Sequence, residues 1–87
     1  MPAYEIWLEK AAERDLKRLD DRLFSQVIRK IRELKINPRP AGAKKLIGSG
    51  NDWRIRAGDH RVIYEIDDGN RVVKVFRVRH RKEVYRR

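Results

Sequence analysis

Three strand-like runs lie within residues 53–78, whose sequence is WRIRAGDHRVIYEIDDGNRVVKVFRV. Each run is rich in β-branched and aromatic residues, and turn-forming residues separate the runs at 58–60 and 67–70. Asp68-Gly69 is a strong hairpin signal, because a two-residue turn of this kind needs a positive φ at both positions. The segment therefore predicts an antiparallel meander. Its strands are expected at residues 53–57, 61–67 and 71–78.

The residues before the meander predict a strand and two helices. Apolar side chains alternate from Tyr4 to Leu8, which is the period of a strand. From Glu9 the apolar spacing becomes helical. The pair Asp20-Asp21 before the next apolar period is typical of the N-cap of a second helix, because an aspartate carboxylate can accept a hydrogen bond from a free backbone N–H. Asn37 precedes a proline and ends that helix, since proline disfavours helical geometry in the residue before it. The apolar stripe of the second helix comprises Leu23, Phe24, Val27, Ile28, Ile31 and Leu34.

These elements predict an α+β fold in a single domain that spans residues 1–87. In the order β-α-α-β-β-β, an N-terminal strand and a two-helix hairpin precede the meander. Both helices then pack on one face of a four-stranded, mainly antiparallel sheet and leave the other face open. Residues 39–51 read as a connecting loop, from which Leu46 and Ile47 are expected to anchor the chain on the core.

The charge of the chain favours a polyanionic partner. Twenty-three Lys and Arg against thirteen Asp and Glu give a net charge of +10 in 87 residues, which favours nucleic acid first and an acidic protein second. The absence of cysteine excludes disulfides and thiolate metal sites. No signal peptide or apolar membrane span is evident, so we expect a cytoplasmic protein that does not associate with membranes.

Strand alternation gathers arginines on the open face. Residues two apart share a face, so Arg54 and Arg56 point the same way and Arg61 joins them from the next strand. Guanidinium groups offer planar, bidentate donors that match phosphate oxygens, which predicts a phosphodiester-binding surface. The alternative for these side chains is simple solvation of the sheet. Arginines of the last strand that share a face are Arg77, Arg79 and Arg81.

RNA cleavage without a metal needs a proton acceptor, donors to the phosphorane and a proton donor for the leaving oxygen. His80 and Tyr85 can move protons. A packed or exposed histidine is an equal alternative for His80, and stacking on a base is an equal alternative for Tyr85. Glu65 is favoured as an ion-pair partner over a base, and His60 as a solvated turn residue. Two histidines without a carboxylate cluster make no zinc site, so no metal or cofactor is predicted.

Six short segments of the chain carry a family resemblance, namely residues 37–39, 45–48, 53–56, 58–64, 78–81 and 84–86. In these segments the chain resembles the RelE toxins of the RelE/ParE toxin-antitoxin superfamily. The resemblance implies a type II toxin that acts as an endoribonuclease, an mRNA interferase that cleaves mRNA in the ribosomal A site and inhibits translation. The 2′-hydroxyl would attack the adjacent phosphate without a metal. A cognate RelB-like antitoxin with an acidic or amphipathic segment would wrap the toxin in a hetero-oligomer.

The resemblance also assigns roles to residues. Arg54 and Arg56 correspond to the pair that grips substrate phosphate, and Lys45 belongs to the same substrate-binding set. Arg61 corresponds to the arginine that stabilises the reacting phosphate, and Tyr85 to the C-terminal tyrosine that stacks on or acts upon the nucleotide.

The last motif admits two alignments. An alignment on Tyr85 makes Arg79 and Arg81 the paired family arginines, whereas one on Val78 makes Arg81 the first of them. Arg81 is thus a catalytic candidate in both, Arg79 a substrate-binding candidate, and His80 corresponds to a histidine that many relatives have before this arginine. Two other functions stay open, namely a ParE-like inhibitor of DNA gyrase and a non-catalytic nucleic-acid-binding module.

Overall fold

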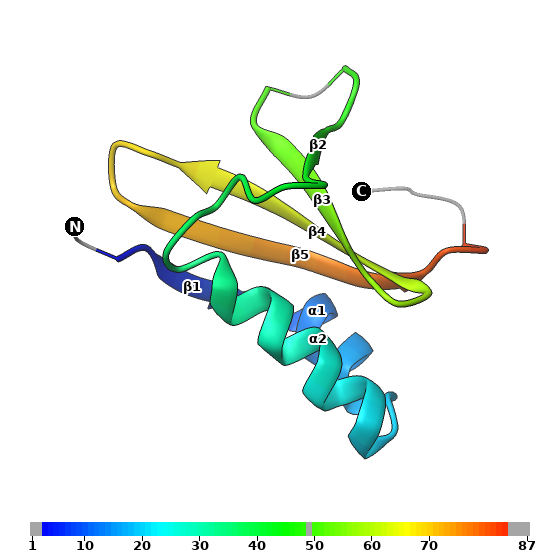
Figure 1. Cartoon of the computed structure of the whole chain (residues 1–87). Coiled ribbons are helices and arrows are strands. Elements are labelled where there is room, and N and C mark those ends of the chain that lie inside the picture. Colours follow the sequence, from blue (N-terminus) through cyan, green and yellow to red (C-terminus); the bar gives the residue numbers. More distant parts are fainter. Residues whose placement is uncertain (1–2, 49, 84–87) are drawn as a thin grey trace.

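The computed structural model describes residues 3–48 and 50–83 (Figure 1). A short strand leads into two consecutive helices, and the remaining strands follow. The predicted α+β order is confirmed. The elements are β1 (Glu5–Leu8), α1 (Lys10–Lys17), α2 (Asp21–Glu33), β2 (Lys44–Lys45), β3 (Asp52–Ala57), β4 (His60–Asp67) and β5 (Val72–His80).

The strands form one mixed sheet in the order β1-β5-β4-β3-β2. β1 runs parallel to β5, and the other neighbouring strands are antiparallel. The sheet has one strand more than predicted, because Lys44 and Lys45 pair with β3 inside the segment that the sequence indicated as loop. Such a two-residue strand is too short to give a period in the sequence.

Both helices pack on the same face of the sheet, as predicted (Figure 1). Because α1 and α2 each present an apolar stripe, their buried side chains interdigitate with those of β3, β4 and β5. Phe24 departs from the predicted stripe, since it is 42% exposed. The prediction that Ile47 anchors the connecting loop on the core is wrong, because its side chain is fully exposed in a turn. Leu46 is half-buried. The buried cluster includes Leu16, Val27, Ile31, Leu34, Ile55, Val62, Tyr64, Ile66, Val73, Val75 and Val78.

Local hydrogen bonds explain where the elements begin and turn. Of the predicted pair Asp20-Asp21, Asp20 is the N-cap of α2, since its Oδ1 accepts a hydrogen bond from the Leu23 amide at 2.8 Å. The hairpin between β4 and β5 was predicted correctly, but its turn is not a two-residue Asp-Gly turn. Asp67 pairs with Val72 and accepts hydrogen bonds from Asn70, while the positive φ (53°) falls on Arg71. The loop is therefore longer than the sequence signal indicated.

A β-bulge in β5 aligns both halves of that strand with the core. Ile63 pairs with Arg77, whereas Tyr64 pairs with Val75, so Phe76 is an extra residue. The bulge reverses the alternation, which lets Val75 before it and Val78 after it both face the helices.

The helix α1 also covers an unpaired edge of β5. Because β1 pairs only with the first part of β5, the Val78 amide has no strand partner on that side. The Asp15 carboxylate accepts a hydrogen bond from this amide at 2.9 Å and from Arg77 Nε at 2.8 Å. Asp15 is only 7% exposed, so a buried carboxylate joins α1 to the sheet. Among the described residues, no helix is long and apolar enough to cross a membrane.

Candidate functional site

Three arginines lie in one row across the open face of the sheet. The register pairs Arg56 of β3 with Arg61 of β4, and Arg61 with Arg79 of β5. The residues next to these arginines in the sequence, such as Ile55 and Val62, belong to the core. Because side chains alternate along a strand, the arginines lie on the face away from the helices. Like charges directly opposite each other destabilise a sheet. The pairing of Arg56 with Arg61 therefore opposes folding, whereas an ion pair with Glu83 offsets the charge of Arg79.

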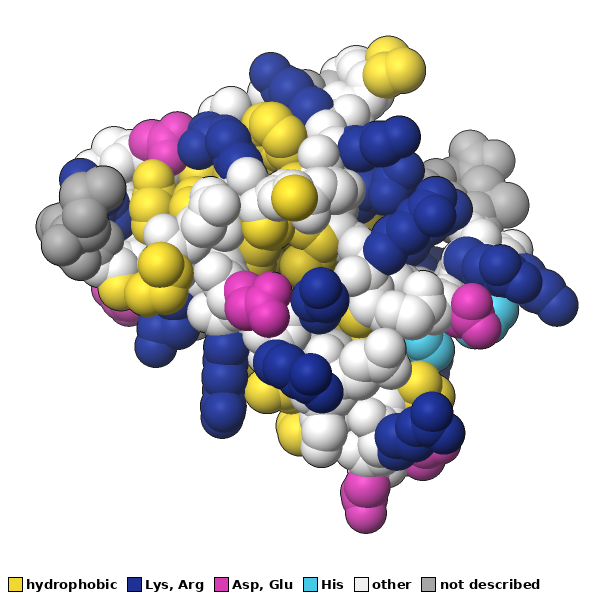
Figure 2. Space-filling view, in the orientation of Figure 1, with side chains coloured by type: hydrophobic (Ala, Val, Ile, Leu, Met, Phe, Trp, Pro, Cys, Tyr) yellow, Lys and Arg dark blue, Asp and Glu magenta, His cyan; other side chains and the backbone are white. Residues whose placement is uncertain are grey.

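A small cavity of about 160 Å³ lies at the end of this row. Arg56, Arg61 and Arg81 all line it, from β3, from β4 and from the residue after β5. The turn between β3 and β4 completes the lining through Gly58, Asp59 and His60. Lys and Arg side chains gather over this part of the molecule on the right of Figure 2, around β3 and its turn.

The electrostatics of Arg61 reflect this crowding. Partial burial lowers the pKa of the Arg61 guanidinium, and the neighbouring charges of Arg54, Arg56 and Arg81 lower it further. A guanidinium stays protonated despite such a shift. We call Arg54, Arg56, Arg61 and Arg81 the arginine cluster. Its mutual repulsion is relieved when an anion binds among the four side chains.

Two other arginines of the last strand are engaged elsewhere. Arg77 forms an ion pair with Asp15 at 2.8 Å, and Arg79 forms one with Glu83 at 2.8 Å. Arg79 therefore pairs with Arg61 in the sheet but does not line the cavity, whereas Arg81 lines it and lies 3.7 Å from the Asp59 carboxylate. The geometry thus brings Arg81 together with Arg56 and Arg61 and holds Arg79 beside them.

The two histidines pack against each other. His60 and His80 are cross-strand neighbours, and their rings meet edge to face with centroids 5.4 Å apart. They alternate with the arginines of their strands, so they lie on the helix side of the sheet. His80 Nδ1 accepts a hydrogen bond from the Lys82 amide at 3.2 Å, and His80 does not line the cavity. His60, which the sequence indicated as a solvated turn residue, has a buried Nδ1.

Lys44 and Lys45 point to opposite faces of the sheet. The register places Lys44 opposite Arg54 and Lys45 opposite Trp53, which packs on the core. Because side chains alternate, Lys44 shares the open face with Arg54, and the substrate-binding candidate Lys45 lies on the helix side. Tyr85 lies outside the described residues.

Sequence reasoning missed four residues of the site, namely Lys44, Gly58, Asp59 and His60. Asp59 and His60 line the cavity because the turn after β3 folds beside Arg81, whose amide donates to the Asp59 carbonyl at 2.7 Å. Gly58 has a φ of +62°, which suits the first position of a two-residue hairpin turn. The Gly-Asp pair between two strand runs was the available signal. Lys44 carries no signal, since its face depends on the pairing register.

The sequence matches the family described as ParE toxin of type II toxin-antitoxin system, parDE, over residues 6–85. It is also 31% identical to Toxin RelG of Mycobacterium tuberculosis, over 97% of this chain and 98% of that protein. This chain belongs to the RelE/ParE family of toxins. Toxin RelE of the same organism is 30% identical to this RelE-like toxin, over 95% of this chain and 87% of the relative.

Solved RelE structures share the fold of this RelE-like toxin. The RelE-RelB complex of the archaeon Pyrococcus horikoshii superposes with a TM-score of 0.82 at 25% identity, over 94% of this chain and 99% of the other. The RelBE2 toxin-antitoxin complex of Mycobacterium tuberculosis gives a TM-score of 0.79 at 29% identity, over 90% and 98%. Both relatives were solved with an antitoxin.

Proposed function

We propose that this RelE-like toxin is a ribosome-dependent endoribonuclease that cleaves mRNA in the ribosomal A site without a metal. The observation that carries the proposal is the cavity lined by Arg56, Arg61 and Arg81, whose charges repel one another. A phosphodiester bound among these guanidinium groups would relieve that repulsion. Action on translating ribosomes would place the protein in the cytoplasm.

In the proposed reaction, the 2′-hydroxyl of the message attacks the adjacent phosphorus and the 5′-oxygen leaves. The phosphorane gathers negative charge as this happens, so Arg61 at the centre of the cluster stabilises the transition state most strongly. Arg56 and Arg81 flank it in the cavity, and Arg54 and Lys44 extend the cationic face toward β2. These outer cations hold the flanking phosphates rather than the reacting one.

Proton transfer is assigned to Tyr85 and His80 as a prediction from the family resemblance. The packing of His80 against His60 favours Tyr85 as the group that reaches the nucleotide. His80 would then help to position the end of β5. Tyr85→Phe should then lower the cleavage rate at saturating ribosome complex more than His80→Gln does. Equal rates for both variants and the wild type would remove both residues from the mechanism.

We also propose that the toxin assembles with a cognate RelB-like antitoxin. The support is the RelE-RelB assembly of its structural relatives and a net charge of +10, which an acidic or amphipathic segment would neutralise. The relatives that match over nearly the whole chain are RelG and RelE toxins, which supports a RelE-like function over a ParE-like one.

The test is to add the purified protein to ribosomes that are translating a defined message, to map the 5′ ends, and to analyse the 3′ end of the upstream fragment. Cuts within the A-site codon that leave a 2′,3′-cyclic phosphate support the proposal, because that end arises from attack by the 2′-hydroxyl. Gyrase-dependent DNA breaks without cleavage of the message would replace it with the ParE-like function.

A further inference from the structure

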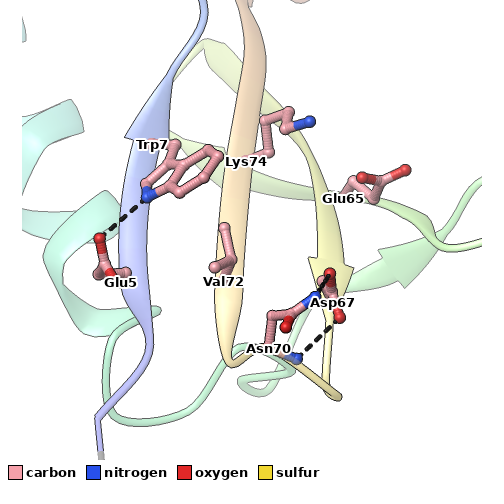
Figure 3. Close-up of a pocket in the computed structure, with 7 residues that line it drawn as sticks. All are labelled: Glu5, Trp7, Glu65, Asp67, Asn70, Val72 and Lys74. Atoms are coloured by element: carbon pink, nitrogen blue, oxygen red, sulfur yellow. Dashed lines mark hydrogen bonds between the residues drawn. The ribbon is translucent and has the colours of Figure 1, made fainter.

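A second and larger hollow, of about 370 Å³, lies on the open face at the opposite end from the arginine cluster. Two cross-strand rows build it from β1, β5 and β4 (Figure 3). Trp7, Lys74 and Glu65 form one row. Glu5, Val72 and Asp67 form the other. We call this site the acidic hollow.

The charge of the acidic hollow is opposite to that of the chain. Glu5, Glu65 and Asp67 supply three carboxylates against the single ammonium of Lys74, in a protein with a net charge of +10. The hydrogen bonds from Asn70 lower the pKa of Asp67, which keeps that carboxylate ionised. A cationic group is therefore attracted to this end of the face and repelled by the other.

The lining of the acidic hollow suits an organic cation rather than a metal ion. Trp7 is 51% exposed, and its Nε1 donates to Glu5 at 3.0 Å, which holds the indole in place beside Lys74 (Figure 3). A guanidinium or ammonium group can stack on an indole while it donates to carboxylates. Among the described residues, no group of three His, Asp or Glu side chains is arranged to hold a metal.

The opposite charges at the two ends of the open face also determine the direction in which a charged segment binds. Arg61 and Glu65 lie on the same face of β4, four residues apart, which corresponds to about 13 Å along the strand. The buried side chain of Ile63 lies between them. A partner segment that follows β4 thus needs an acidic side chain at one end and, about four residues away, a basic side chain at the other.

We propose that the acidic hollow binds an arginine or lysine side chain of the antitoxin, while an acidic residue of the same segment meets the arginine cluster. This inference rests on the proposed function for its partner. It concerns binding alone, so it does not depend on whether the toxin cleaves RNA.

The experiment measures the affinity of the cognate antitoxin, separated from the coexpressed complex, for the intact toxin by calorimetry. Glu65→Lys should weaken binding at least about tenfold, and Glu65→Gln and Trp7→Ala should each weaken it less, because they remove an attraction without adding repulsion. Glu13→Gln, which removes an exposed carboxylate from α1, is the matched control and should bind as the wild type does. RNA cleavage by the Glu65 variants without antitoxin should equal that of the wild type.

A double-mutant cycle identifies the partner residue. Alanine at one basic residue of the antitoxin should cost as much affinity as Glu65→Gln, and the two losses should not add. The inference is overturned if Glu65→Lys, Glu65→Gln and Trp7→Ala all bind the antitoxin as tightly as the wild type, or if no antitoxin binds the wild-type chain. Failure of the wild type to cleave mRNA would overturn the proposed nuclease and leave this binding result intact.

Discussion

The two faces of the sheet differ in what they contribute to this toxin. The helix side carries a continuous apolar core around Tyr64 and Val62, so it holds the fold together. The open side gathers Arg56, Arg61 and Arg81, whose like charges oppose folding. Residues that are neighbours in the sequence thus have opposite effects on stability, so the proposed binding of RNA and the stability of the fold can be tested separately.

The largest expected effect comes from removing Arg61, the arginine at the centre of the arginine cluster. Arg61→Ala should lower the rate of mRNA cleavage on ribosomes by about 100- to 1,000-fold, because it removes a donor to the phosphorane. The midpoint of urea unfolding should not fall, since the substitution also relieves repulsion with Arg56 and Arg81. Arg29→Ala, on the exposed side of α2, is the charge-matched control and should keep the cleavage rate. A loss of stability that accompanies the loss of cleavage would contradict the separation of the two faces.

A substitution on the helix side of the sheet should instead lower the stability of the fold. Asp15→Ala leaves Arg77 and the Val78 amide without their acceptor and should lower the free energy of unfolding by about 2 kcal/mol. Burial opposes the ionisation of Asp15, but the hydrogen bonds from Arg77 and Val78 outweigh it and lower the pKa of the carboxyl. The stability from this group is therefore present at neutral pH and is lost as the pH falls. Denaturant unfolding at pH 7 and pH 3 measures both effects, and equal losses from Asp15→Ala at the two values would contradict the assignment.

Much of the difference between the two faces of the sheet can be predicted from the sequence. The alternation in residues 53–78 predicts the strands and places Arg54, Arg56 and Arg61 on one face, because the period of a strand is local. The bulge at Phe76, the face of Lys44 and the contact between His60 and His80 depend on how strands pair. Pairing register is set by the tertiary packing of the core, so no local pattern could reveal them.

On the helix side, the contribution of a single hydroxyl group to stability can be tested at Tyr64. Its hydroxyl donates to the Pro38 carbonyl at 2.7 Å, and burial raises the pKa of the phenol to about 12. Because the folded state favours the neutral phenol, this stability is complete below pH 10 and is lost as the pH rises toward about 12. Tyr64→Phe should cost about 1 kcal/mol at pH 7 and less at pH 11.5. Urea unfolding at both values checks this, and an unchanged loss at the higher pH would count against it.

The smallest effect compares two adjacent lysines. Lys44→Ala should weaken binding of the toxin to the ribosome-message complex and reduce the salt dependence of that binding, because Lys44 shares the open face with Arg54. Lys45→Ala should leave both unchanged, since Lys45 lies opposite Trp53 on the helix side. A loss confined to Lys45→Ala would instead support Lys45 as the substrate-binding residue, as the family resemblance implies.

In the proposed reaction, the arginine cluster stabilises attack by a 2′-hydroxyl on its neighbouring phosphate. The most direct measurement places a single 2′-deoxynucleotide at the mapped cleavage position of an A-site message and follows one turnover on the ribosome. We predict no cut at the deoxy position and, for the unmodified message, a product that ends in a 2′,3′-cyclic phosphate. Cleavage of the deoxy message at the normal rate would contradict the account.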